Sequence, residues 1–170
     1  SMQDGGREGS LISILDKTQT AMGGRLLKKW ISAPLRDLDP IKKRHDSVEE
    51  LLKNKKIRKE LTENLKEIGD LERLISRICT LRATPREVVA VKSSLKKIPD
   101  TKELLNQLKV STLKNISEQL DPLENISEKI ATAIIDSPPA SVNEGGIIRN
   151  GFSPELDELR DISLHGKEWI

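Results

Sequence analysis

Four prolines that each follow a helix-capping residue constrain the fold of this chain most strongly. Proline is tolerated best at the first position of a helix, and a preceding Ser, Thr or Asp can accept hydrogen bonds from the free N–H groups there. The four pairs are Asp39-Pro40, Thr84-Pro85, Asp121-Pro122 and Ser153-Pro154. Glu87 and Glu124, three residues after two of these caps, match or approximate the reciprocal capping box. The sequence therefore predicts separate helices that begin at these points.

Apolar residues recur between these starts with the spacing of three and four that places side chains on one helical face. The longest stripe is predicted to run without a break over residues 61–81. The next stripe continues to Ile98 and is stopped by Pro99. Shorter stripes over residues 22–30 and 123–134 end before Pro34 and before Pro138-Pro139. These patterns predict an all-α fold, a multi-helix bundle.

Residues 145–152 break the helical pattern. Ile147 and Ile148 are β-branched, and glycines bound them on both sides. We expect a short extended segment that crosses to the last helix, with Gly145, Gly146 and Gly151 in backbone angles that other residues avoid. A flexible surface loop is the alternative interpretation.

Composition excludes several classes of function. The 170 residues carry a net charge of only +2, which argues against a surface built wholly for phosphate. Two tryptophans, one phenylalanine and no tyrosine disfavour a single-strand binder that stacks bases on aromatic rings. The lone Cys79 offers no disulfide framework, so we expect a reducing, cytoplasmic compartment. No apolar run approaches the roughly 20 residues of a membrane span.

No catalytic, metal or cofactor site can be assembled from the sequence. His45 and His165 have no ligand partner at metal-binding spacing, so we expect structural roles for both. Gly23-Gly24 lacks the lysine and hydroxyl of a phosphate loop, and the pair is expected to let two helices approach closely.

Two other features are also interpreted as structural. Cys79 lies on the long stripe without an activating histidine, so it is expected to fill the core or its boundary. The basic runs at residues 42–44 and 53–59 are expected to be solvated helical faces, with phosphate contact as the alternative.

Residues 8–37, EGSLISILDKTQTAMGGRLLKKWISAPLRD, resemble the opening of the core, or lever, domain of the MutS family of DNA mismatch recognition ATPases. The matching positions are Gly9, Ser10, Leu11, Leu15, Asp16, Thr18, Thr20, Met22, Gly23, Arg25, Leu26, Leu27 and Trp30. Later segments also match, through Asp70-Leu71-Glu72-Arg73, Arg77, Arg82, Pro85 and Arg86. A third signature is met by Gly145, Gly146, Ile148, Gly151, Phe152, Glu155, Leu156, Asp157, Leu159 and Arg160. The resemblance covers about residues 8–170.

The resemblance implies domain III of a mismatch repair protein, which mechanically couples mismatched-DNA binding by the clamp and mismatch-binding domains to the ATPase domain. The mismatch-reading motif and the nucleotide-binding loop of the family fall outside these residues, so the chain itself is expected to be non-catalytic and to hold no cofactor. ATP and Mg would belong to the ATPase domain of a DNA-dependent ATPase parent. The implied partners are mismatched duplex DNA bound through other domains, the rest of the MutS chain, and a second copy in a homodimer. A cytoplasmic, nucleoid-associated protein is expected.

The resemblance also divides the chain. Residues 1–8 are expected to be a connector remnant, 9–142 the helical core bundle, 143–152 the extended Gly-rich segment, and 153–170 the start of the lever helix. Because the chain stops at Trp169-Ile170 without a cap, we expect it to end just before the clamp.

The same signature supplies the candidate site residues, with structural or coupling roles: Gly145, Gly146, Gly151, Glu155, Leu156, Asp157 and Arg160. Apolar positions that a returning lever helix would cover are expected to be exposed, among them Leu156, Leu159, Ile162 and Trp169. The alternative function is a free-standing helical scaffold for protein–protein interaction, in which the stripes pack internally and a charged face binds a partner.

Overall fold

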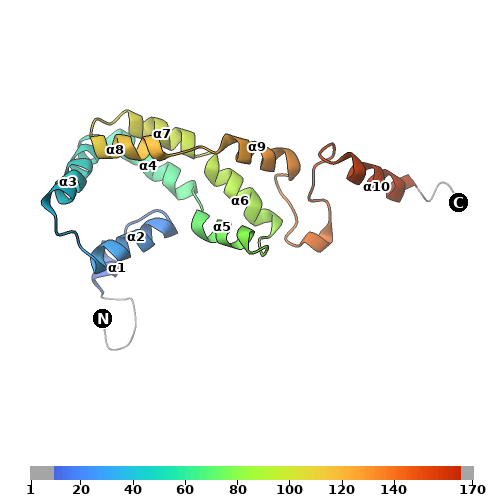
Figure 1. Cartoon of the computed structure of the whole chain (residues 1–170), viewed down its shortest axis with the longest axis horizontal. Coiled ribbons are helices and arrows are strands. Elements are labelled where there is room, and N and C mark those ends of the chain that lie inside the picture. The colour runs from blue at the N-terminus through green and yellow to red at the C-terminus, as the bar shows by residue number, and fades with distance from the viewer. Residues whose placement is uncertain (1–9, 166–170) are drawn as a thin grey trace.

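The computed structural model describes residues 10–165, which form helices joined by connecting segments (Figure 1). The elements are α1 (Leu11–Leu15), α2 (Ala21–Ser32), α3 (Leu38–Lys53), α4 (Lys55–Glu67), α5 (Leu71–Cys79), α6 (Pro85–Leu95), α7 (Ile98–Asn106), α8 (Ser111–Gln119), α9 (Glu124–Ala133), the 3₁₀ turn η1 (Val142–Glu144) and α10 (Pro154–His165). The predicted all-α multi-helix fold is confirmed. Within this part of the chain, no helix is both long and apolar enough to span a membrane.

The helices pack as two sets. In the first bundle, α3 packs on α4 and α8, and α7 packs on α4 and α8. In the second bundle, α5 and α9 both pack against α6. Figure 1 shows the first bundle at the upper left, the second in the centre, and α10 reaching away at the opposite end from α3.

The leucine core lies in the first bundle. It consists of Leu61, Leu104, Leu105, Leu108 and Leu113, which come from α4, from α7 with the residues after it, and from α8. Leu108 is only 1% exposed. Val91 and Leu95 of α6 are buried in the second bundle, and Ile68 and Ile98 are buried near the connections between the bundles. Burial of such side chains stabilises each set of helices by about 1.5–3 kcal/mol per side chain.

Two of the four predicted helix starts are correct. Thr84 caps α6 with the full reciprocal box, in which Glu87 accepts the Thr84 N–H and the Thr84 hydroxyl accepts the Glu87 N–H. Ser153 precedes α10, and its hydroxyl accepts the Leu156 N–H at 3.3 Å. At both places Pro occupies the first helical position, where its missing N–H costs nothing.

The other two starts are displaced. The Asp121 carboxylate accepts the N–H of Leu123 at 2.9 Å, which closes a local turn in which Leu123 is left-handed, with φ 49°. Helix α9 therefore begins at Glu124, and the predicted capping box with Asp121 is wrong. Helix α3 begins before the predicted Asp39 cap, with Asp37 at its N-cap. Pro40 lies in the first turn, where its missing N–H has no helical partner to lose.

The uninterrupted helix predicted over residues 61–81 is wrong. Helix α4 ends at Glu67, Gly69 follows, and Asp70 begins a new helix by accepting the Arg73 N–H. The apolar spacing continued across this break by coincidence. Leu81, the last member of the stripe, is 95% exposed.

The predictions for Ile98 and Cys79 are also wrong. Ile98 belongs to α7 rather than to the end of α6, because α6 stops at Leu95 and Pro99 lies in the first turn of α7. Cys79 is exposed rather than part of the core. The helix over residues 22–30 is confirmed as α2, but Trp30 remains 41% exposed.

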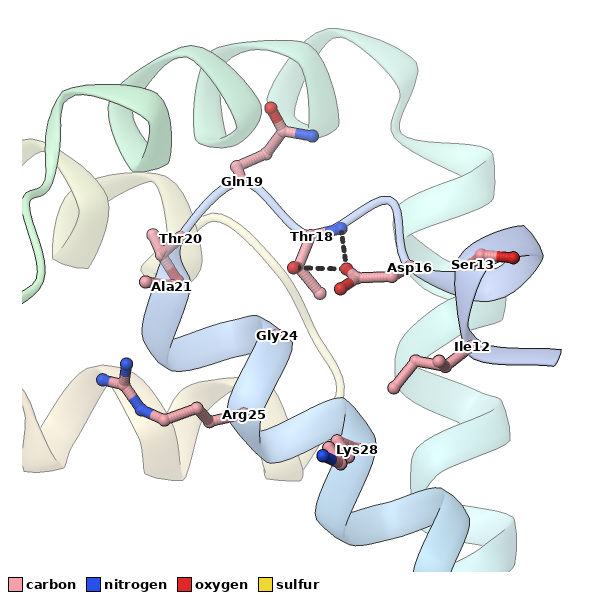
Figure 2. A pocket seen from close by; sticks show the side chains of 10 residues that line it. All are labelled: Ile12, Ser13, Asp16, Thr18, Gln19, Thr20, Ala21, Gly24, Arg25 and Lys28. Carbon is pink, nitrogen blue, oxygen red and sulfur yellow. Dashed lines mark hydrogen bonds between the residues drawn. The ribbon is translucent and has the colours of Figure 1, made fainter. Parts of the chain in front are cut away.

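Gly23 and Gly24 make close approaches, but not to a second helix. A Cβ at Gly24 would lie 3.3 Å from the side chains of Asp16 and Thr18, and one at Gly23 would lie 3.0 Å from Thr20 Oγ1. Figure 2 shows the loop folded back beside α2, with Asp16 accepting hydrogen bonds from the backbone and hydroxyl of Thr18. The lack of side chains at Gly23 and Gly24 therefore lets the preceding loop pack against α2, the helix that contains them.

Candidate functional site

A short extended segment joins the second bundle to α10. Ile148 pairs with Ile134 in an isolated antiparallel bridge at the end of α9. The Ile135 N–H donates to the Ile147 carbonyl at 3.0 Å, and the Arg149 N–H donates to the Ala133 carbonyl at 2.9 Å. An extended segment is therefore present in the centre of residues 143–152, as predicted, although residues 142–144 form the turn η1.

The three predicted glycines have the expected backbone geometry. The φ angles are 71° at Gly145, 65° at Gly146 and 83° at Gly151, in the left-handed region that favours glycine. A Cβ at any of the three would meet no atom within 4 Å. Backbone strain alone, rather than lack of space, therefore selects glycine here.

Arg149 fixes this segment to the second bundle. Its Nε donates to the Ala131 carbonyl at 2.7 Å, and its Nη2 donates to the Asp136 carboxylate at 2.8 Å. Ala131 lies in the last turn of α9, where carbonyl groups lack helical partners. A cation at this end of a helix is also favoured by the helix dipole. Arg149 thus supplies a hydrogen-bond donor to the C-terminal end of α9 from outside the helix.

Asp136 links Arg149 to the body of the second bundle. Its carboxylate accepts from Lys92 Nζ of α6 at 2.7 Å as well as from Arg149. The Lys92 side chain is 5% exposed, whereas that of Asp136 is 74% exposed. The hydrogen bond from Lys92, and then that from Arg149, lowers the pKa of Asp136 to about 2. One carboxylate therefore connects α6 to the extended segment.

Arg160 attaches α10 to the other side of the same segment. Its guanidinium donates to the Ile148 carbonyl and to Asn150 Oδ1, both at 2.8 Å, and to Asp157 at 3.0 Å. Asp157 in turn accepts the Gly151 N–H at 2.6 Å. The first turns of α10 are therefore held to the segment by charged groups.

The structure brings three of the seven predicted site residues into direct contact, Gly151, Asp157 and Arg160, and Gly145 and Gly146 precede them in the extended segment. The other two lie beside them in the first turn of α10. Glu155 is exposed, and Leu156 is half-buried.

Four residues of this junction were not identified from the sequence. Arg149 and Asn150 lie between the predicted glycines, so their position in the extended segment was an available signal. Lys92 and Asp136 come from elsewhere in the chain, and only the packing of α6 on α9 brings them here.

The expected exposure of apolar positions on α10 is confirmed for Leu159 and Ile162, but not for Leu156, which is half-buried. Leu159 is 63% exposed and Ile162 is 59% exposed. Trp169, and the expected end of the chain before the clamp, lie outside the described residues.

The junction is built from charged side chains and backbone groups. Its charged groups neutralise one another or bind backbone carbonyls. Within residues 10–165, no three His, Cys, Asp or Glu side chains lie where they could hold a metal ion. His45 is exposed on α3, and the side chain of His165 is not among those described.

The fold and this junction define the class: an all-α multi-helix domain with a projecting terminal helix. Comparison with known proteins then identifies the family. The family described as MutS domain III matches residues 1–166. The chain belongs to this family, and the resemblance seen in its motifs is confirmed.

Curated proteins with similar sequences support the same family assignment. The DNA mismatch repair protein MutS of Salinibacter ruber is 44% identical over 170 residues, which is 100% of this chain and 19% of that protein. The one from Halothermothrix orenii is 46% identical over 163 residues, covering 96% of this chain and 18% of that protein. The one from Listeria monocytogenes is 45% identical over 170 residues, covering 100% and 20%. The chain thus spans about a fifth of the length of these relatives, and they give no support to a free-standing scaffold.

Proposed function

We propose that this chain is the coupling domain of a MutS-type mismatch repair protein and transmits conformational change between mismatched DNA and a nucleotide site elsewhere in the parent. In this proposal residues 9–142 are the core bundle, 143–152 the pivot and 153–170 the start of the lever helix, with residues 1–8 as a connector.

The observation that carries this proposal is the attachment of α10. Among the described residues, α10 has no extensive packing contact with another helix. It is held at its base, where Arg149 binds the extended segment to α9 and Arg160 binds α10 to that segment. Rotation of a helix as a rigid body about such a short segment is an established form of conformational switching. A small change at this joint would move the far end of α10 through a larger distance.

The remaining parts of the proposal concern the parent protein. We propose that it is a homodimeric, DNA-dependent ATPase that binds mismatched duplex and holds ATP and Mg in domains outside this chain. In that protein this domain contributes no catalytic residue. A nucleoid-associated protein of the cytoplasm fits this role.

The proposal is tested in the full-length parent protein with Gly151→Val. A β-branched residue resists φ 83°, so the segment must change its path before α10. We expect mismatched duplex to accelerate nucleotide release less than it does in the unchanged protein, while ATP hydrolysis without DNA stays the same.

The matched control is Ala140→Val, which adds the same side chain at an exposed position before the segment. It should leave both rates unchanged. If Gly151→Val preserves the full effect of mismatched DNA on nucleotide release, the segment is not the pivot.

A further inference from the structure

The two helical bundles are joined mainly along the chain itself. Within residues 10–165, the extensive helix–helix contacts all lie inside one bundle or the other. The chain passes between the bundles at residues 68–70, at 96–97 and at 120–123. An ion pair between Lys97 and Glu67 at 2.7 Å lies near two of these passages. The leucine core of the first bundle does not extend into the second, although Ile68 and Ile98 are buried at two of these passages.

Helix α2 contacts both bundles. In the N-terminal half of α2, Arg25 reaches α5 of the second bundle, where its Nη1 and Nη2 donate to the two oxygens of Asp70 at 2.9 and 2.7 Å. Its Nε also donates to Glu72 at 2.9 Å. In Figure 2 the Arg25 side chain extends away from Asp16 and from the loop beside α2.

Near its C-terminal end α2 meets the first bundle. The guanidinium of Arg44, on α3, lies over the ring of Trp30 with its central carbon 3.5 Å from the ring centroid. This is well within the range in which an arginine is attracted to the face of an aromatic ring. A single helix of 12 residues thus spans from α3 to α5.

We propose that α2 is a brace that fixes the angle between the two bundles, with Arg25 and Trp30 as its two points of attachment. This inference concerns the bundles and does not depend on the proposed role of α10. It explains why α2 is an ordered helix although none of its residues is buried.

The attachment at Arg25 is stronger than an ordinary surface ion pair. Single exposed pairs contribute little to stability, but a two-pronged arginine–carboxylate contact within a network of charges is the exception. The Arg25 hydrogen bonds hold the pKa of Asp70 below its ordinary value. Asp70 and then Glu72 raise the pKa of Arg25.

Asp70 lies at a position where its contact with Arg25 can affect the orientation of the second bundle. Asp70 begins α5 and caps it through the Arg73 N–H. It directly follows Gly69, whose N–H donates to the hydroxyl of Ser94 in α6 at 3.0 Å. The brace therefore grips the second bundle at the point where the chain enters it from α4.

Distance measurements between the bundles test the brace. Spin labels are placed on the exposed native Cys79 of α5 and on a second cysteine introduced by Lys59→Cys in α4, and double electron–electron resonance gives the distribution of distances. We expect Arg25→Gln and Arg44→Gln each to widen this distribution, with helical content by circular dichroism unchanged. Glu72→Gln, which removes a carboxylate without altering α2, should widen it less.

The matched control is Glu63→Gln, which breaks an exposed ion pair with Lys66 inside α4. Its distribution should equal that of the unchanged chain. A brace needs both attachments, so an unchanged distribution in either arginine variant would overturn the proposal. If Arg25→Gln does not fold, Glu72→Gln and Arg44→Gln decide the outcome by the same criterion.

Discussion

Thr84 and Glu87 bond to each other in both directions across the first turn of α6. The Glu87 N–H donates to Thr84 Oγ1 at 3.3 Å, and the Thr84 N–H donates to Glu87 Oε2 at 2.8 Å. The other carboxylate oxygen of Glu87 forms an ion pair with Arg77 of α5 at 2.7 Å. The Thr84 N–H and then Arg77 lower the pKa of Glu87. One capping box therefore also joins two neighbouring helices.

Thr84→Ala should reduce the free energy of unfolding by about 1 kcal/mol, because the first turn of α6 loses its side-chain acceptor. Urea denaturation followed by circular dichroism measures this change. Thr132→Ala is the control, since Thr132 is exposed in α9 and its hydroxyl bonds to carbonyls of its own helix. A loss in Thr132→Ala as large as that in Thr84→Ala would remove the capping box as the cause.

Leu81→Gly should stabilise the protein by up to about 1 kcal/mol, a gain from relieved strain that is partly offset by the added freedom of the unfolded chain. Leu81 has φ 56° and is 95% exposed, so the change removes backbone strain and little packing. The Arg82 N–H donates to the Arg77 carbonyl at 2.8 Å across this turn, a geometry that usually has glycine at the left-handed position. Thermal unfolding provides the measurement. The reverse change, Gly151→Ala, should lower stability, and equal melting temperatures for both variants and the parent would contradict the strain argument.

Asp136→Asn should alter how stability depends on pH. The folded pKa of Asp136 is about 2, below its ordinary value of 3.8, so its ionised form stabilises the fold above about pH 4. This contribution disappears as the pH falls through 2. The difference in melting temperature between the parent and Asp136→Asn should therefore be largest near neutral pH and shrink between pH 4 and pH 2.

Asp46→Asn serves as the control for this titration, because Asp46 is exposed on α3. Its melting temperature should follow that of the parent across the same range. A difference for Asp136→Asn that stays constant down to pH 2 would show that the ion pairs with Lys92 and Arg149 do not form in solution.

The exposed apolar residues of α10 should make the 170-residue chain self-associate as its concentration rises. Leu159 and Ile162 are each more than half exposed. Static light scattering should show a mass that increases with concentration, and the double variant Leu159→Ser, Ile162→Ser should remain monomeric. If the unchanged 170-residue chain is monomeric at all concentrations, this prediction is wrong.

Local signals in the sequence predicted the fold best. Thr84-Pro85 and Ser153-Pro154 were read correctly because a cap and a first-turn proline act within a few residues. The left-handed glycines 145, 146 and 151 were found for the same reason. The helix start predicted at Asp121 was wrong because an Asp carboxylate can either cap a helix or close a turn. Here the carboxylate of Asp121 accepts the Leu123 N–H and closes a turn.

Features that depend on distant parts of the chain could not be predicted. The stripe over residues 61–81 has helical spacing throughout, yet one helix ends at Glu67 and Asp70 starts another. The contact of Arg149 with the Ala131 carbonyl depends on the path of the segment between them, and nothing in the residue types specifies it. The meeting of Arg25 with Asp70, 45 residues apart, likewise becomes visible only in three dimensions.

Ion pairs hold the junctions of Arg25 and Asp136, whereas the core of the first bundle consists of leucines. Dissolved salt screens exposed charges, with a Debye length of about 10 Å at 0.1 M, but leaves apolar burial intact or strengthens it. Ionic strength should therefore loosen the contacts of Arg25 and Asp136 while the helices themselves persist. The overall dimensions of the molecule should therefore depend on the salt concentration. The radius of gyration measured by scattering would increase with salt while the helical content stays constant.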